Sequence, residues 1–285
     1  MLKILSNRIK FIPLLLLAAC AAGGPEKRVN HGEGPVSARA RNTLASEDPA
    51  GLVTVAEGFE RAGNLEGAYN LYSQAAAADP NLMAAKLGIS RVLAKTGRLD
   101  QAQAILDNLG QQFPDALELK LTQVDVAIMR ADYAVADAEL STVITPDTTD
   151  LTQLILAGQL AQVTGNARRA RIMFDRALVV APSHPGVIRN MALSFALEGE
   201  FETAVALLQK TLDMPASVTP SKRSLALVYA LSGQKKAAQV IAGGATDESE
   251  FQRMSVAFDL LPRLNKSEQA ALLMFDHLPR DIMQR

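Results

Sequence analysis

The sequence contains no tryptophan, one cysteine, four tyrosines and three histidines among its 285 residues. A single cysteine excludes an intramolecular disulfide. His31, His184 and His277 stand far apart, and none has a second ligand at metal-binding spacing. Basic and acidic residues nearly balance, at a formal net charge of −1, so the chain has no broad basic field for nucleic acid. These absences argue against a metalloprotein, a disulfide scaffold and a nucleic-acid-binding protein.

The motifs of common enzyme classes are also missing. The sequence has no GxSxG, P-loop or HExxH motif, and no nucleophilic cysteine apart from Cys20. Acidic pairs such as Glu198 with Glu200 fall at expected helix ends, where solvated capping explains them better than acid–base catalysis. We therefore expect no catalytic residue, no metal site, no cofactor and no enzymatic activity.

The single cysteine follows an N-terminal signal. Three basic residues among the first ten precede an apolar stretch that ends at Ala19 and is too short to span a bilayer by itself. The run Leu17-Ala18-Ala19-Cys20 resembles a bacterial lipobox, in which the cysteine receives acyl chains such as palmitate. An ordinary secretory peptide with a chance cysteine at its end is the alternative interpretation.

The lipobox resemblance implies three further expectations. Residues 1–19 form a lipoprotein signal peptide, and residues 20–48 hold the lipidated Cys20 and a flexible tether rich in glycine, proline and charge. More than one acyl chain provides a stable membrane anchor. Because Ala21 rather than aspartate follows the cysteine, the sequence resembles lipoproteins of the outer membrane, with the protein facing the periplasm.

Alanine, in contrast, is abundant and regularly spaced. Six alanines stand 34 residues apart without a change of register, and five glycines keep the same spacing, with Ala131 in the missing place. A 34-residue period is typical of repeats that each consist of two antiparallel helices. The alanines are Ala68, Ala102, Ala136, Ala170, Ala204 and Ala238, and the glycines are Gly63, Gly97, Gly165, Gly199 and Gly233.

Other residues at the same spacing resemble the tetratricopeptide repeat (TPR) family. In the first repeat, Leu52, Ala56 and Phe59 match the large, small and aromatic positions of the first helix, while Tyr72 and Pro80 match the second helix and its end. The resemblance implies an all-α, right-handed solenoid of about six helix-turn-helix repeats over residues 49–245.

Two irregularities and two additional helices are expected around this solenoid. The third repeat lacks its terminal proline, and residues 143–150 should break its second helix early. Gly243-Gly244 should shorten the second helix of the sixth repeat. Asp247 and Asn265, each followed three residues later by glutamate, predict two helices within residues 246–285 that cap the C-terminal end of the core.

The family resemblance also implies a concave face lined by the first helix of each repeat. Early repeats place mostly charged residues there, whereas late repeats place mostly apolar residues. We expect the late positions to bind an amphipathic partner peptide, with its acid on the arginines. The alternatives are that the C-terminal helices fold back over the leucines or that a tight superhelix buries them. The early residues are Glu57, Glu60, Arg61, Arg91, Lys95, Glu118 and Asp125; the late ones are Ile155, Val163, Arg189, Leu193, Leu197, Arg223, Leu227 and Leu231.

A more specific resemblance lies in residues 188–242. Their paired cores NMALSFALEG and SLALVYALSG, joined by a short proline-containing link, resemble the TPR lipoprotein of Flp-type tight-adherence (Tad) pilus assembly, the TadD type. This resemblance implies a non-catalytic outer-membrane lipoprotein that helps to assemble or position the pilus secretion apparatus, with a secretin or another pilus component as partner. A pilotin-like lipoprotein of another secretin system and a periplasmic adaptor for cell-envelope enzymes are the alternatives.

Overall fold

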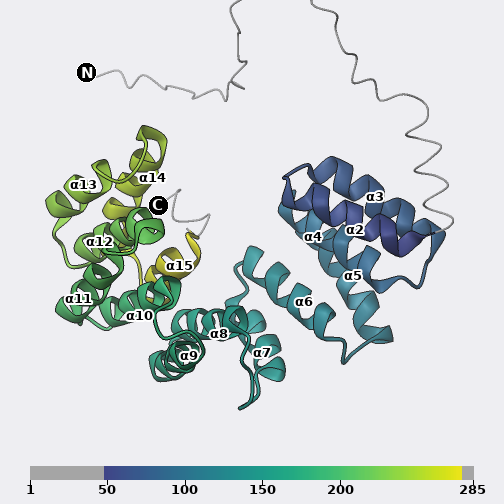
Figure 1. Cartoon of the computed structure of the whole chain (residues 1–285), viewed down its shortest axis with the longest axis horizontal. Helices are drawn as coiled ribbons and strands as arrows, with labels where there is room; N and C mark the ends of the chain where they lie inside the picture. Colours follow the sequence, from purple (N-terminus) through teal and green to yellow (C-terminus); the bar gives the residue numbers. More distant parts are fainter. Residues whose placement is uncertain (1–47, 278–285) are drawn as a thin grey trace, which may run out of the picture. The chain divides into compact units, whose positions relative to one another are not determined.

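The computed structural model describes residues 48–277 of the chain (Figure 1). The expected signal peptide, Cys20 and the tether up to residue 47 lie outside the described residues. Among residues 48–277 there are only helices, turns and irregular segments, and no helix is long and apolar enough to cross a membrane.

Helices follow one another in pairs along the described chain. We name the first helix of each repeat the A helix (α2, α4, α6, α8, α10 and α12) and the second the B helix (α3, α5, α7, α9, α11 and α13). Two helices, α14 and α15, and two short 3₁₀ helices complete the described part. The bounds are α2 Pro49–Arg61, α3 Leu65–Ala78, α4 Met83–Lys95, α5 Leu99–Gln112, α6 Leu117–Met129, α7 Tyr133–Val143, α8 Leu151–Val163, α9 Ala167–Val180, α10 Pro185–Leu197, α11 Phe201–Leu212, η1 Pro215–Ser217, α12 Val218–Leu231, α13 Lys235–Gly243, α14 Glu248–Leu260, η2 Leu261–Arg263 and α15 Lys266–Phe275.

The turns between A and B helices explain the spacing of the glycines. All five glycines of the 34-residue series have positive φ angles, between 77° and 86°, which L side chains rarely adopt. Ala131, in the missing place, takes the same left-handed conformation at φ 63° despite its side chain. The turn therefore has the same geometry in every repeat.

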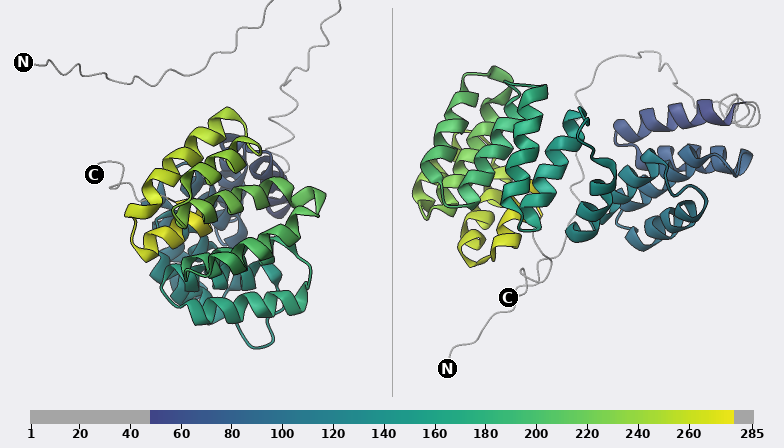
Figure 2. Two further views of the ribbon diagram at one scale, coloured as in Figure 1. Left: turned by 90° about the vertical axis from the view of Figure 1, so that its left-hand side faces the viewer. Right: turned by 90° about the horizontal axis from the view of Figure 1, so that it is seen from below.

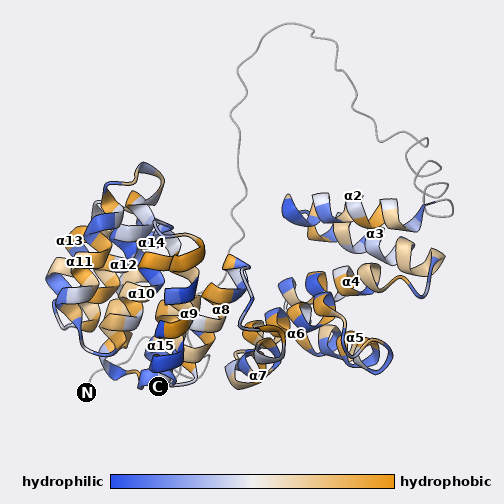
Figure 3. Ribbon diagram, turned by 60° about the horizontal axis from the view of Figure 1, so that its bottom comes forward, coloured by the Kyte–Doolittle hydropathy of each residue, from blue (hydrophilic) through white to orange (hydrophobic). Residues whose placement is uncertain are grey.

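The alanine series explains how the two helices of a repeat approach each other. All six alanines have an exposed fraction of 0%. Large side chains fill the remaining space, and some require a glycine opposite them. A Cβ added at Gly88 would lie 2.4 Å from the ring of Tyr72 in the preceding repeat, and one added at Gly158 would lie 2.4 Å from the ring of Phe174 in the same repeat. Each helix accordingly carries both apolar and hydrophilic residues (Figure 3).

Both expected irregularities are present. Helix α7 ends at Val143, and residues 144–150 connect it to α8, whereas four residues connect α3 to α4 and α9 to α10. Pro146 prevents the helix from continuing because it disfavours the helical conformation of Thr145. Helix α13 stops at Gly243 after nine residues. The 34-residue period survives in repeat 3 because the loop replaces the last helical turn.

The two helices that follow the repeats pack against the later repeats. Asp247 accepts a hydrogen bond from the amide of Glu250 at the start of α14, and Asn265 forms a capping box with Glu268 at the start of α15. Helix α14 contacts α12 and α13, whereas α15 contacts α8 and α10. The yellow C-terminal helices accordingly lie beside the green helices in both views of Figure 2. The expected fold class, a solenoid with C-terminal capping helices, is confirmed.

Candidate partner-binding surfaces

A cluster of charged and hydroxyl groups joins the A helices of repeats 1 and 2. The Glu60 carboxylate accepts hydrogen bonds from Tyr72 Oη at 2.8 Å and from Lys95 Nζ at 2.7 Å. Arg91 Nη2 donates to the same carboxylate at 3.2 Å and to Tyr72 Oη at 3.1 Å. The Glu60 side chain is only 7% exposed, whereas that of Lys95 is 40% exposed. We name Glu60, Tyr72, Arg91 and Lys95 the early polar cluster.

The early polar cluster stabilises its own charges. Burial opposes ionisation of Glu60, but the hydrogen bonds from Lys95, Arg91 and Tyr72 outweigh it and hold the pKa of Glu60 below its usual value. Burial and the Glu60 carboxylate both raise the pKa of the Tyr72 hydroxyl.

The remaining early residues of the concave face have access to solvent. Arg61, Glu118 and Asp125 are exposed, and Glu57 is half-buried. The substantial contacts of α2, α4 and α6 are with one another and with the B helices next to them in the chain. A charged surface that a partner could reach therefore extends over repeats 1–3.

The late part of the concave face is covered by the chain itself. Leu193 and Leu197 have exposed fractions of 5% and 1%, because α15 packs across α8 and α10. The Lys266 ammonium group donates to the carbonyl of Leu197, and Ser267 Oγ donates to the carbonyl of Val163 at 2.7 Å. These two contacts satisfy carbonyl groups at the C-terminal ends of α10 and α8.

The far end of α15 lies against repeat 3. The ring of Phe275 stacks on Tyr133 at a centroid distance of 5.3 Å, and Tyr133 Oη lies 3.0 Å from His277 Nδ1. Burial raises the pKa of Tyr133 to about 12. At the same end, Gln159 Nε2 donates to the carbonyl of Met274 at 3.2 Å. Helix α15 is thus fixed by polar contacts at both of its ends as well as by its apolar residues.

The other late residues are engaged within the chain to different degrees. Leu227 and Leu231 are half-buried and pack against the core that α14 and α15 help to form, and Ile155 packs against the core of repeats 3–5. Arg223 Nε forms an ion pair with Glu250 of α14 at 2.8 Å. Arg189 is half-buried, and desolvation lowers its pKa.

The sequence leaves three possibilities for the late leucines: an open groove, a groove covered by the C-terminal helices, or burial by a tight superhelix. In the structure, the C-terminal helices cover Leu193 and Leu197. The apolar surface that Leu193 and Leu197 would offer to a peptide is occupied by α15, and the acid that Arg223 would bind comes from Glu250. The physical reason is the hydrophobic effect: the apolar side chains of the later A helices are more stable in contact with an apolar helix than in contact with water. The role of the late residues in partner binding stays a prediction.

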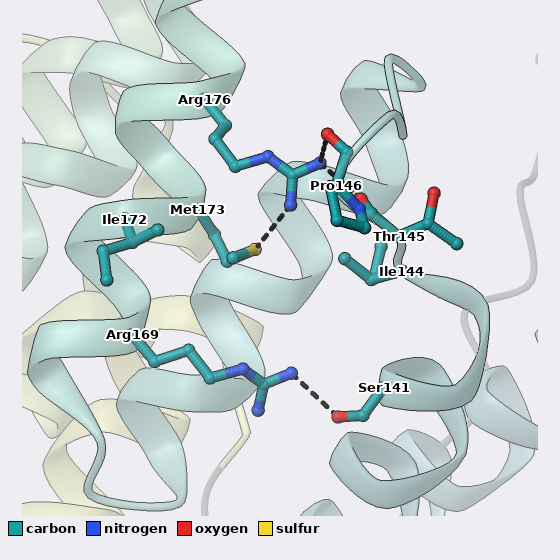
Figure 4. A pocket seen from close by; sticks show the side chains of 8 residues that line it. All are labelled: Ser141, Ile144, Thr145, Pro146, Arg169, Ile172, Met173 and Arg176. Carbon is teal, nitrogen blue, oxygen red and sulfur yellow. Dashed lines mark hydrogen bonds between the residues drawn. The ribbon is translucent and has the colours of Figure 1, made fainter.

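A pocket on the B-helix side was not expected from the sequence. It lies between α9 and the loop that follows α7, has a volume of about 660 Å³, and is lined by Ile144, Pro146, Ile172, Met173 and Arg176 among others (Figure 4). Pro146 indicated the break in α7, but only the packing of α9 shows that the break leaves a hollow. Among residues 48–277, no group of three His, Cys, Asp or Glu side chains could hold a metal ion.

Comparison with known proteins agrees with this architecture. A family model described as tetratricopeptide repeat matches residues 60–124. The crystal structure of a tetratricopeptide repeat protein from Parabacteroides merdae superposes with a TM-score of 0.64 at 13% sequence identity, covering 83% of this chain and 96% of that one. The fold is a TPR solenoid.

Two further structures resemble this solenoid. The structure of Pseudomonas aeruginosa pilF has a TM-score of 0.57 at 14% identity and covers 76% of this chain and 99% of that one. The APC/C hetero-tetramer Cut9–Hcn1 has a TM-score of 0.56 at 16% identity and covers 78% and 44% of the two chains. No curated protein matches the sequence. At these identities the similarity of the solenoids concerns the fold alone.

Proposed function

We propose that the protein is a non-catalytic scaffold that binds other proteins, and that it acts as an outer-membrane lipoprotein in the assembly or positioning of a Tad/Flp pilus secretion apparatus. The observation that carries the scaffold function is the TPR solenoid itself, whose A helices in repeats 1–3 present a charged surface with open access. Stacked repeats of this kind form extended concave binding surfaces.

The pilus role rests on the resemblance of residues 188–242 to the TadD type. Those residues form most of α10, α11, α12 and α13, the same region that α14 and α15 cover. The likeness to P. aeruginosa pilF supports the solenoid on which this role would depend. A secretin or another component of the pilus apparatus is the proposed partner.

The membrane location rests on the lipobox-like run that ends at Cys20. Acylation of this cysteine would hold the solenoid at the periplasmic side of the outer membrane through the tether. Metabolic labelling with a palmitate analogue tests the anchor: we expect label in the natural protein and none in Cys20→Ser. Label that survives this substitution would contradict the anchor without affecting the scaffold function.

Deletion of the gene tests the pilus role. We expect surface pili to disappear while prepilin is still synthesised, and plasmid-borne protein to restore them. A complementing variant with Arg91→Glu and Lys95→Glu should restore pili less well, since it reverses two charges of the open surface. Normal piliation in the deletion strain, with secretin multimers intact, would contradict the proposal.

A further inference from the structure

The pocket between α7 and α9 exists because repeat 3 lacks one helical turn. Where a full-length B helix would lie, the chain leaves α7 after Val143 and runs through Thr145 and Pro146 instead. The missing turn uncovers one side of α9, and the loop does not refill the space. A hollow of about 660 Å³ remains, within the size range of ligand pockets.

The loop that borders this hollow is held in one position by a single arginine. Arg176 Nη2 donates to three carbonyl oxygens, those of Thr145 at 2.7 Å, Pro146 at 3.1 Å and Thr148 at 3.1 Å. Figure 4 shows Arg176 beside Thr145 and Pro146. The hydroxyl oxygen of Thr148 also accepts a hydrogen bond from the amide of Thr145 at 2.8 Å. The pocket is therefore formed before any ligand arrives, which lowers the entropic cost of binding.

The floor of the pocket is apolar. Ile144 and Pro146 come from the loop, and Ile172 and Met173 come from α9. Ile172 is 47% exposed. A large apolar side chain of a partner would remove this surface from water, which is favourable in proportion to the area covered.

The edge of the pocket is positively charged. Two arginines of α9, Arg169 and Arg176, line it; α9 also carries Arg168 and Arg171 outside the lining, and one acidic residue, Asp175. Arg169 is paired with Asp137 at 2.7 Å and Arg171 with Glu200 at 2.5 Å. Within residues 48–277, no carboxylate lies within 4.0 Å of the Arg176 guanidinium, whose Nη1 atom has only the Met173 sulfur at 3.9 Å.

We propose that this pocket binds a peptide segment of a partner protein that inserts a large apolar side chain between Ile172 and Ile144 and places a neighbouring acidic side chain on Arg176. The open positive charge beside an apolar floor selects this chemistry, because guanidinium groups bind carboxylates through charge-assisted hydrogen bonds. The site lies on the B helices, apart from the A-helix surface of repeats 1–3. It goes beyond the proposed function and does not depend on a pilus role.

A set of synthetic peptides tests the proposal with the natural chain from residue 21 onwards. Fluorescein-labelled decapeptides carry a central leucine, isoleucine, phenylalanine or methionine flanked either by aspartates or by lysines, with a central alanine as reference. Fluorescence anisotropy measures their affinities. We expect the aspartate-flanked apolar peptides to bind about tenfold more tightly than the alanine or lysine forms.

Three variants locate the binding. Ile172→Asp and Arg176→Gln should each weaken the best peptide about tenfold, whereas Val240→Asp, at a 77% exposed position of α13, should not change it. Ile172 is on the surface, so its variant should fold even if Arg176→Gln loosens the loop; circular dichroism melting checks both. Equal affinities in all variants, or no saturable binding by any aspartate-flanked peptide, would overturn the proposal. The proposal would also be overturned if the protein bound phosphatidylethanolamine–phosphatidylglycerol vesicles but no peptide, and if Ile172→Asp and Arg176→Gln abolished the binding to vesicles.

Discussion

Repeat 2 and repeat 5 carry opposite chemistry at the same two positions of their A helices. Arg91 and Lys95 in α4 correspond to Leu193 and Leu197 in α10, three repeats of 34 residues later. The basic pair is balanced by a carboxylate from the preceding repeat, and the leucines are covered by α15. The same fold therefore supports a charged A-helix face in the N-terminal half, repeats 1–3, and a covered apolar face in the C-terminal half, repeats 4–6.

The charged face and the covered apolar face differ in how much they contribute to the free energy of unfolding. Fully burying a leucine contributes about 1.5–3 kcal/mol relative to leaving it exposed, so the covering of Leu193 and Leu197 is a substantial stabilisation. The Glu60 carboxylate is only 7% exposed, so the cost of removing it from water offsets most of what its ion pairs contribute. We infer that α15 is part of the stable core of repeats 4–6, whereas the early polar cluster leaves repeats 1–3 less stable but able to bind a charged partner.

The largest expected effect comes from the same substitution at equivalent positions of the two halves. Leu197→Glu should lower the free energy of unfolding of repeats 4–6 by about 3–5 kcal/mol, because it places an unpaired charge beneath α15 at a site that is 1% exposed. Chemical denaturation and hydrogen exchange of α8, α10 and α15 measure the loss.

Lys95→Glu is the matched control for this experiment. Its site is 40% exposed, so the new carboxylate can turn into water, and Arg91 and Tyr72 still donate hydrogen bonds to Glu60; the loss of the Lys95 hydrogen bond should cost about 1.5–3 kcal/mol, less than Leu197→Glu. If both variants lose the same stability, or if Leu197→Glu leaves exchange in α15 unchanged, α15 does not cover the groove in solution. The comparison between the two halves would then fail.

The sequence was sufficient to predict the solenoid because its repeats are local and regular. Alanines at 0% exposure and glycines with positive φ recur along the chain, so spacing alone located the A and B helices and the break at Pro146. The covering of Leu197 by α15 was only one of several alternatives, since it depends on how residues more than 60 positions apart meet. The α9 pocket was missed altogether, because it results from an absent helical turn rather than from a motif.

A smaller loss of stability is expected in both halves where a glycine lies against a buried aromatic ring. Gly88→Ala and Gly158→Ala each bring a methyl group to 2.4 Å from a buried ring, of Tyr72 and Phe174 respectively. Overpacking of this kind costs about 1–3 kcal/mol. Gly58→Ala, where nothing lies within 4 Å, should instead stabilise α2 by about 0.5–1 kcal/mol through its helix propensity. Thermal melts of the three variants test this packing. Melting temperatures of Gly88→Ala and Gly158→Ala as high as that of Gly58→Ala would disprove the close contact of these glycines with the rings.

The smallest expected effect is a dependence of stability on pH. We expect it in the early polar cluster and not in the apolar half. The pKa of Glu60 lies below its ordinary value of 4.5 in the folded protein, so the stability that its charge contributes is fully present above pH 4.5 and is lost as the pH falls through the lower, folded-state pKa. Glu60→Gln should therefore cost about 1–2 kcal/mol near neutral pH, and this difference from the natural protein should shrink below pH 4.5.

Gln162 provides the control for this pH dependence, because it occupies in repeat 4 the place of Glu60 in repeat 1 and carries no charge. Its Oε1 atom accepts a hydrogen bond from Ser194 Oγ at 2.6 Å. Gln162→Ala should destabilise repeats 4–6 by a similar amount at neutral and at acidic pH, since no proton is taken up when this hydrogen bond breaks. Urea denaturation between about pH 3 and pH 8 measures both variants. If the difference in the free energy of unfolding between Glu60→Gln and the natural protein stays constant over this range, hydrogen bonding and not charge holds the early polar cluster together. The two halves would then differ in polarity but not in the contribution of a charge to stability.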